Sequence, residues 1–520
     1  MPTDIQAPSI AYWPLLSILI VFGAATLGVL VEAGVPARLR RNAQIIVSFL
    51  GLAAALGFVV YLSIDRTPQI VAAGAIAIDG PTLFLQAVLC VLGIGGIFLL
   101  SERRLDQSGG EVVAQASHLP GSPEDRRLAE SAHVQTEVYP LAMFALGGML
   151  LFPACNNLLL SFVALEVLSL PLYLMAGLAR RRRLLSQEAA VKYFLLGAFA
   201  SAFFLYGVAL LYGYAGSVDL GDIFAATAVT GKSDNLLFLG LAMLAVGLLF
   251  KIGAVPFQAW TPDVYQGSPT PVTALMASCT KVAAFGALLR IFYVGFGSAG
   301  WDWRPMMWAI AILTMVVGAV LAVTQTDVKR MLAYSSIAHT GFILVGLCAL
   351  SATGHASKDA LSATLFYLLA YGFTTMASFA VVGLVRDRSG EATHLAQWTG
   401  LGRRSPVVAG VFAFLLFALA GIPLTSGFVA KFAVFKAGIE GGATALVIVG
   451  VVASAVTAFF YARVVVLMFF QEPAADGPTV AVPSSYTGVT IAVGVAVTAV
   501  LGVAPQLALD WADHAAVFLR

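Results

Sequence analysis

The chain has 520 residues, of which 60% are hydrophobic and only 11% are charged, with a net charge of +2. Soluble domains carry about 25% charged residues, and apolar stretches of about 20 residues, enough to cross a bilayer as helices, recur throughout this chain. These features exclude an ordinary soluble protein. We expect an all-α polytopic membrane protein that sits in the lipid bilayer and has no nucleic-acid partner.

Apolar windows bounded by charged, polar, Gly or Pro residues predict about 14 transmembrane helices. The first window has no basic segment or cleavage site before it, so we expect a retained span and not a signal peptide. The cysteines lie inside apolar windows without CxxC spacing, which indicates neither disulfides nor a metal or iron–sulfur site. The predicted spans are 10–33, 42–64, 80–101, 137–154, 157–178, 188–215, 235–258, 268–295, 303–324, 328–350, 357–386, 405–424 continuing brokenly to 440, 443–470 and 485–506.

Basic residues are distributed unevenly between the connections. The odd-numbered connections hold seventeen Arg and Lys residues, among them the run 180–183, whereas the even-numbered ones hold chiefly four. Because positive charge favours the cytoplasmic side, the odd connections are predicted to be cytoplasmic. An even number of spans then places both termini outside, in the plasma (inner) membrane of a bacterium.

The longest polar segment, 102–136, mixes Gly, Ser, Pro and charged residues without periodicity. We expect a mobile cytoplasmic loop, which a partner could use for docking. The predicted organisation is a three-helix segment with this loop at 1–136, two repeats at 137–295 and 303–470, and a C-terminal helix at 485–520.

Two charged residues stand in the fifth and sixth spans. Glu166 lies mid-span among aliphatic residues, where an unpaired charge costs several kcal/mol. It is either a neutral, hydrogen-bonded carboxyl or a functional group with a basic partner, and the second is favoured. Lys192 lies near the start of its span and could extend to the interface. The small residues that follow it predict close helix packing, which would turn Lys192 inward.

Two lysines flank a broken segment, FKIGAVPFQAWTPDVYQGSPTPVTALMASCTK, at 250–281. Lys251 precedes the mid-span Pro256, and Lys281 follows a polar corner. Charges at membrane depth are costly and usually functional, and a proline there frees backbone groups that need partners. Lysine, unlike arginine, can release its proton in such surroundings. The pair therefore indicates a path for ions or protons, and the choice of lysine over arginine favours protons.

His339 lies near the middle of its span beside Tyr334, Ser335, Ser336 and Thr340. A lone intramembrane histidine is often only a packing residue. The neighbouring hydroxyl groups favour a hydrated relay, because histidine titrates near neutral pH.

Lys431 lies in a second interrupted span, FALAGIPLTSGFVAKFAVF, after Pro423. Two interrupted helices that each carry a lysine, in corresponding places of two halves, indicate an inverted repeat. The fold class predicted is thus two inverted five-helix repeats, each with one broken helix. The correspondence is imperfect, because Lys251 precedes its proline whereas Lys431 follows its own.

Most of the chain, 137–470, resembles the antiporter-like membrane subunits of respiratory complex I, which are related to multisubunit cation/proton antiporters. FKIGAVPFQAWTPDVYQGSPTPVTA and KRMLAYSSIAHTGFILVG are shared broadly in that family, and LAGIPLTSGFVAKF is most similar to its N-type members. The resemblance implies a row of proton-carrying side chains across the membrane midplane. Its members would be Glu166, Lys192, Lys251, Lys281, His339 and Lys431.

The resemblance further implies a non-redox, proton-translocating subunit of an NADH:quinone oxidoreductase. No nucleotide, haem or iron–sulfur motif occurs in the chain, so NADH, FMN, iron–sulfur clusters and quinone are expected on partner subunits. The expected membrane partners are the M-type subunit and the small J and K types. The alternatives are a subunit of a cation/proton antiporter and a non-pumping scaffold.

Overall fold

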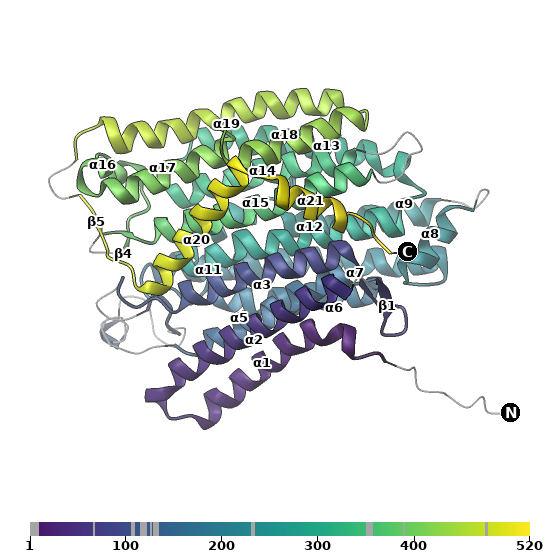
Figure 1. Ribbon diagram of the computed structural model, residues 1–520, viewed down its shortest axis with the longest axis horizontal. Helices are drawn as coiled ribbons and strands as arrows, with labels where there is room; N and C mark the ends of the chain where they lie inside the picture. Colours follow the sequence, from purple (N-terminus) through teal and green to yellow (C-terminus); the bar gives the residue numbers. More distant parts are fainter. Residues whose placement is uncertain are drawn as a thin grey trace.

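The computed structural model describes residues 10–65, 68–105, 110–114, 122–124, 127, 135–229, 234–349, 357–387, 390–473 and 477–519. Most of them lie in long helices that run side by side in one bundle, with α1 at one edge and α19 at the other (Figure 1). The short strands lie at the two ends of the bundle, with β1 at the end where the chain terminates and β4 and β5 at the opposite end.

The first half of the chain contributes a three-helix segment and a set of shorter helices around a break. The elements are η1 (Trp13–Leu15), α1 (Leu16–Gly34), α2 (Ala37–Asp65), β1 (Gln69–Val71), β2 (Ile76–Ile78), α3 (Gly80–Leu100), α5 (Val138–Leu151), η2 (Phe152–Ala154), α6 (Leu158–Ala176), α7 (Arg183–Ala215), α8 (Leu220–Thr227), α9 (Asn235–Ile252), α10 (Trp260–Gly267), α11 (Thr270–Leu275), the π-helical turn η3 (Met276–Thr280), α12 (Lys281–Arg290) and the π-helical turn η4 (Ile291–Gly295).

The second half contains another break and ends in two helices beyond the long α19. Its elements are α13 (Gly300–Val323), α14 (Val328–Cys348), α15 (Lys358–Val382), β3 (Val385–Asp387), β4 (Gly390–Glu391), η5 (Leu395–Trp398), α16 (Leu401–Arg404), α17 (Pro406–Ala420), α18 (Ser426–Glu440), α19 (Thr444–Phe470), β5 (Thr479–Val480), α20 (Ser485–Val503) and α21 (Gln506–Ala515).

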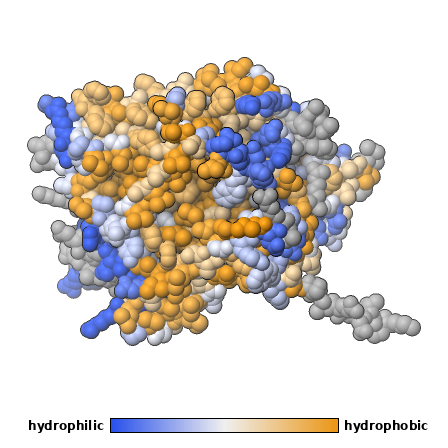
Figure 2. All heavy atoms as spheres, viewed as in Figure 1, coloured by the Kyte–Doolittle hydropathy of each residue, from blue (hydrophilic) through white to orange (hydrophobic). Residues whose placement is uncertain are grey.

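The predicted spans are confirmed. In the described part of the chain, 12 helices are long and apolar enough to cross a membrane, and two shorter apolar helices, Val138–Ala154 and Pro406–Ala420, occupy the other two predicted positions. Hydrophobic residues cover the middle of the face in Figure 2, and hydrophilic residues gather mainly toward its two ends. This is the surface that a bilayer requires.

Both predicted breaks are present. The first begins at Gly253, three residues before the proline that indicated it, and is followed by the unpredicted helix α10. The second separates α17 from α18 between Gly421 and Thr425. Both upstream half-helices end at a glycine in the left-handed region, with φ of +72° at Gly253 and +85° at Gly421. That conformation favours a residue without Cβ.

Small residues let the helices around the first break approach closely, as predicted for α7. A Cβ on Gly207 would stand 2.5 Å from the backbone nitrogen of Leu244 on α9, and one on Gly247 would stand 2.7 Å from Phe204. With no hydrophobic driving force between helices in lipid, such close contact is a main source of helix association.

The prediction of a mobile loop over 102–136 is wrong for its described residues 110–114. Val113 N donates to the Leu178 carbonyl at 2.8 Å, and Arg180 N donates to the Glu111 carbonyl at 2.8 Å. Val112 also forms an isolated β-bridge with Ala179. This stretch is therefore fixed to the connection between α6 and α7, while much of the remaining loop lies outside the described residues.

Candidate functional site: a line of buried basic side chains

The break between α9 and α10 frees backbone groups, and side chains from other helices bind them. Trp260 Nε1 donates to the Phe250 carbonyl at 2.9 Å, and Thr340 Oγ1 donates to the Ile252 carbonyl at 2.9 Å. On the far side of the break, Val255 N donates to Thr314 Oγ1 at 3.0 Å. Such partners make a non-helical backbone tolerable at membrane depth.

Lys251 lies in the last turn of α9, where the helix dipole favours a cation. Lys251 is only 3% exposed. The ammonium donates to Ser169 Oγ at 2.7 Å and to Tyr193 Oη at 3.3 Å, and it lies 5.8 Å from the ring centre of Tyr173. All of its hydrogen-bond partners among the described residues are hydroxyl groups.

Glu166 lies on α6, one turn before Ser169, so both side chains share a helix face. Its Oε1 is buried without a hydrogen-bond partner. Its charge acts on Lys251 through space, but no ion pair joins the two among the described residues. Lys251, the predicted basic partner, is therefore a neighbour of Glu166 and does not contact it directly. The Lys251 ammonium binds Ser169 instead.

Lys281 follows the π-helical turn η3, a type of irregularity that is frequent at functional sites. The ammonium donates to the Ser336 carbonyl at 2.7 Å, to the Ser336 hydroxyl, and to Thr340 Oγ1 at 2.8 Å. Since Thr340 also donates to the Ile252 carbonyl, next to Lys251, one hydroxyl connects the surroundings of the two lysines.

His339 is 2% exposed, and its ring centre lies 5.3 Å from that of Tyr371 and 5.6 Å from that of Phe342. The Lys281 ammonium lies over the Tyr371 ring, and the Lys431 ammonium lies over the Phe342 ring. The His339 Nδ1 is 2.8 Å from Tyr367 Oη, whereas its Nε2 is buried without a partner. A cavity of about 10 Å³, lined by His339, Tyr367 and Tyr371 among others, adjoins the ring. A volume of about 10–15 Å³ is enough for one water molecule.

Lys431 lies on α18, yet its ammonium returns to the end of the preceding half-helix. It donates to the Ala420 carbonyl, the last residue of α17, at 2.8 Å and to Ser454 Oγ at 2.9 Å. Both breaks therefore have a lysine ammonium at the C-terminal end of the upstream half-helix. The two ammonium groups therefore occupy equivalent places, although Lys251 precedes its proline in the sequence and Lys431 follows its own.

The structure brings five of the six predicted residues into one buried region and separates Lys192 from them. The expectation that Lys192 turns inward is wrong for this chain, because its side chain is 40% exposed and forms ion pairs with Glu188 and Asp263, each at 2.6 Å. The next residue, Tyr193, is the one that points inward and contacts Lys251.

Several hydroxyl residues of the site could not be assigned from sequence. Ser336 and Thr340 were indicated as neighbours of His339, but they bind Lys281. Ser169 shares a face with Glu166, which was an available signal. Tyr371, which donates to Ser336 Oγ at 2.8 Å, and Ser454 lie on other helices, and no local pattern marks them.

Comparison with known proteins places the chain in a family. Residues 155–457 match the family described as NADH:quinone oxidoreductase/Mrp antiporter, TM. Proteins named NADH-quinone oxidoreductase subunit N are 60% identical to the chain in Parafrankia sp. (strain EAN1pec), over 98% of this chain and 96% of the relative, and in Acidothermus cellulolyticus, over 100% and 98%. The chain belongs to the NADH-quinone oxidoreductase subunit N family. It is a membrane-spanning subunit of such a complex, and its partners are other membrane subunits of the complex.

Solved structures agree with this family. A chain in respiratory complex I from Thermus thermophilus with bound aureothin is 32% identical, with a TM-score of 0.75 over 95% of this chain and 98% of that chain. A chain of the Mrp complex from Dietzia sp. DQ12-45-1b has a TM-score of 0.79 at 24% identity, over 97% and 96%, which shows a shared fold alone. The subunit N family is thus better supported than the antiporter alternative.

Proposed function

We propose that this subunit moves protons across the membrane through Glu166, Lys251, Lys281, His339 and Lys431. Glu166 acts electrostatically on Lys251, the neighbouring base on α9. Lys281 and His339 pass protons along the row, and Lys431 connects them to the far side or to a neighbouring subunit. Lys192 does not belong to this row. It contributes only as a charged neighbour, ion-paired with Asp263 where α7 meets α10.

The observation that carries this proposal is that one hydroxyl group, that of Thr340, lies between Lys281 and the residue next to Lys251. Thr340 Oγ1 accepts from Lys281 at 2.8 Å and donates at 2.9 Å to the carbonyl of Ile252, next to Lys251. Tyr371 and Ser336 then extend the polar contacts from Lys281 toward His339, whose ring centre is 5.3 Å from that of Tyr371. Rotating hydroxyl groups and a few waters suffice to move a proton over such steps.

The chemistry of the redox reaction belongs to other subunits under this proposal. NADH, FMN, iron–sulfur clusters and quinone bind elsewhere in the complex, and this chain is its non-redox translocase part. The adjoining partners are the M-type subunit and the small J and K types. Each charge moved against 100 mV requires about 2.3 kcal/mol, supplied by quinone reduction.

The orientation proposed has the arginine-rich connections in the cytoplasm and both termini outside a bacterial plasma membrane. Figure 1 supports it, because β4, β5 and α16 lie at one end of the bundle and the C-terminus at the other.

The test is replacement of Glu166 or Lys251 by Ala in the complete complex. We expect proton pumping and coupled quinone reduction to fall in membrane vesicles, because the proton loses its first carrier, while the complex still assembles. Full pumping in both variants would refute the proposal. Loss of assembly in place of activity would favour the scaffold alternative, and sodium-dependent exchange without a redox reaction would favour the antiporter.

A further inference from the structure

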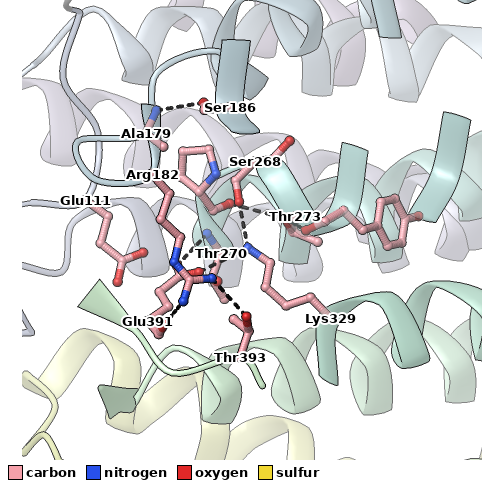
Figure 3. Close-up of polar contacts among 12 residues, drawn as sticks. Glu111, Ala179, Arg182, Ser186, Ser268, Thr270, Thr273, Lys329, Glu391 and Thr393 are labelled. Carbon is pink, nitrogen blue, oxygen red and sulfur yellow. Dashed lines mark hydrogen bonds and ion pairs between the residues drawn. The ribbon is translucent and has the colours of Figure 1, made fainter. Parts of the chain in front are cut away.

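A second cavity lies at the end of the bundle where the arginine-rich connections meet. It has a volume of about 30 Å³ and is lined by Glu111, residues 179–182, residues 266–269, Arg386, Gly390 and Glu391. At about 10–15 Å³ for each water molecule, it holds two or three. Figure 3 shows Glu111, Arg182, Lys329 and Glu391 converging here from separate parts of the chain.

Unpartnered polar atoms surround this cavity. The Glu111 side chain is 8% exposed and is ion-paired through Oε1 with Arg386, but its Oε2 is buried without a hydrogen-bond partner. Ser268 Oγ and Thr270 Oγ1 are buried without partners as well. An unsatisfied buried polar atom costs about 1–3 kcal/mol. Glu111 and Ser268 line this water-sized space, and Thr270 follows the lining residue Pro269, so water molecules bound there would satisfy these atoms.

Glu111 also adjoins a second carboxyl group. Glu391 lines the same cavity, close enough for its charge to act on Glu111. The Glu391 Oε2 accepts from Lys329 Nζ at 3.1 Å, and its Oε1 accepts from Thr270 N at 3.1 Å. Two adjacent buried carboxyl groups do not both ionise readily, so one proton is shared between them.

The surrounding charges decide which carboxyl holds that proton. Burial raises the pKa of both groups. For Glu391, the charge of Lys329, the Thr270 N–H and the charge of Arg386 outweigh burial and hold the pKa well below its usual range. For Glu111, Arg386 does not offset burial together with the negative charge of Glu391, so the pKa is raised to about 8.

A polar route leads from this pair toward Lys281. Lys329 Nζ also donates to the Ser268 carbonyl at 2.6 Å, between α10 and α11. The Tyr265 hydroxyl, on α10, lies close to Ser336. Ser336 in turn binds the Lys281 ammonium. Tyr265 does not line the cavity, so the step from the carboxyl pair to Tyr265 would require further ordered water molecules.

We propose that this cavity is a water-filled proton-uptake site, in which Glu111 and Glu391 share the proton that passes to Lys281. A hydronium ion in the cavity gives its proton to the carboxyl pair, which gives it to the water chain leading inward, so only O–H and N–H bonds form and break. The site rests on the proposed function, and it adds a residue, Glu111, that comes from the long 102–136 segment.

A purely structural role for Glu111 makes a different prediction. The ion pair with Arg386 also fixes residues 110–114 to the bundle. If anchoring were its whole role, Glu111 would stay ionised and would not titrate near neutral pH. The protonation state of Glu111 therefore separates the two roles.

Infrared difference spectroscopy on the complete purified complex tests this directly. The wild type should show a protonated-carboxyl C=O band that disappears as the pH rises through mildly alkaline values. Glu111→Gln should lose the band, and Glu111→Asp should keep a shifted one. Glu124→Gln, a matched change at an exposed position of the same segment, should leave it unchanged. Identical spectra for the wild type and Glu111→Gln would overturn the proposal.

Proton pumping by the same variants in liposomes separates this inference from the function on which it rests. We expect a several-fold slower rate in Glu111→Gln and wild-type rates in Glu124→Gln. Glu111→Asp should restore most of the rate, which also covers the case that Glu111→Gln fails to assemble. Normal pumping by Glu111→Gln together with loss of pumping in Lys251→Ala would overturn the uptake site alone. Normal pumping in both would overturn the proposed function.

Discussion

The three buried lysines of the row are held mainly by neutral oxygen atoms. Ser169 and Tyr193 accept from Lys251, and the carbonyl of Ala420 and Ser454 accept from Lys431. A carboxylate in direct contact would hold the proton on the ammonium, since separating a buried ion pair is costly. Hydroxyl and carbonyl oxygens bind the ammonium without fixing its charge, which suits a group that must lose its proton in each cycle.

Glu102 shows the opposite arrangement outside the spans. It accepts hydrogen bonds from Ser484 N and Oγ at 2.8 and 2.7 Å and from Arg104 N at 2.7 Å. Burial alone would raise its pKa, but these bonds outweigh burial and hold the pKa below its usual value. The carboxylate therefore fastens the start of α20 to the end of α3.

The stability of the protein should depend on Glu102 in a pH-dependent way. Because its pKa is lowered on folding, its stabilisation is present above the unfolded pKa of about 4.3 and is lost as pH falls through the folded value. We expect Glu102→Gln to cost about 1–2 kcal/mol at pH 7, seen as a lower unfolding temperature, with a smaller difference near pH 4.

The control for that comparison is Glu472→Gln, at a side chain that is 87% exposed, which should leave the unfolding temperature unchanged. An equal effect of Glu102→Gln at both pH values would contradict the hydrogen-bonded carboxylate.

At the scale of elements, the two broken helices place a lysine ammonium at equivalent points. Lys251 ends α9, and Lys431 reaches back from α18 to the final carbonyl of α17. The sequence predicted both breaks from Pro256 and Pro423. It did not predict that the first break begins at Gly253, where the left-handed conformation and the close approach of Thr261 appear only in the folded chain.

Gly421 should be essential to the geometry of the second break. A Cβ there would stand 2.9 Å from Lys431 Cδ, and the left-handed conformation costs a non-glycine residue about 1–2 kcal/mol. We expect Gly421→Ala to displace Lys431 and to slow proton pumping in assembled complex.

Gly410→Ala, on the same half-helix, is the matched control, because a Cβ at Gly410 has no neighbour within 4 Å. It should pump like the wild type, and equal pumping by Gly421→Ala would contradict the described geometry.

At the scale of the whole molecule, hydropathy predicts the spans well. A helix that crosses a bilayer needs about 20 apolar residues, whichever helices it packs against. The buried charges were equally visible, since each interrupts an apolar window. Their partners were not, because Tyr371 and Ser454 reach the site from helices far apart in sequence. Lys192 was misplaced for a related reason: small residues on α7 predict where it packs, but Asp263 of α10 decides where the lysine points.

The long 102–136 segment shows a second limit of sequence reasoning. Its polar composition predicts a mobile loop, yet Glu111 is fixed by Arg386, which lies 275 residues further along the chain. Contacts over such separations leave no local pattern. The region predicted as one C-terminal helix over 485–520 forms two, α20 and α21. The separate α21 was not predicted because its 10 residues are too few for a span.

In the proposed mechanism, buried lysines, and not lysines in general, carry the protons. Its most direct test is the rate of proton pumping by assembled complex in liposomes for Lys431→Ala and Lys436→Ala. Both residues lie on α18, but Lys431 is 5% exposed, whereas the Lys436 side chain is 64% exposed. We expect a strongly reduced rate of proton pumping for Lys431→Ala and a wild-type rate for Lys436→Ala. Equal, unimpaired rates in the two variants would contradict the proposed mechanism.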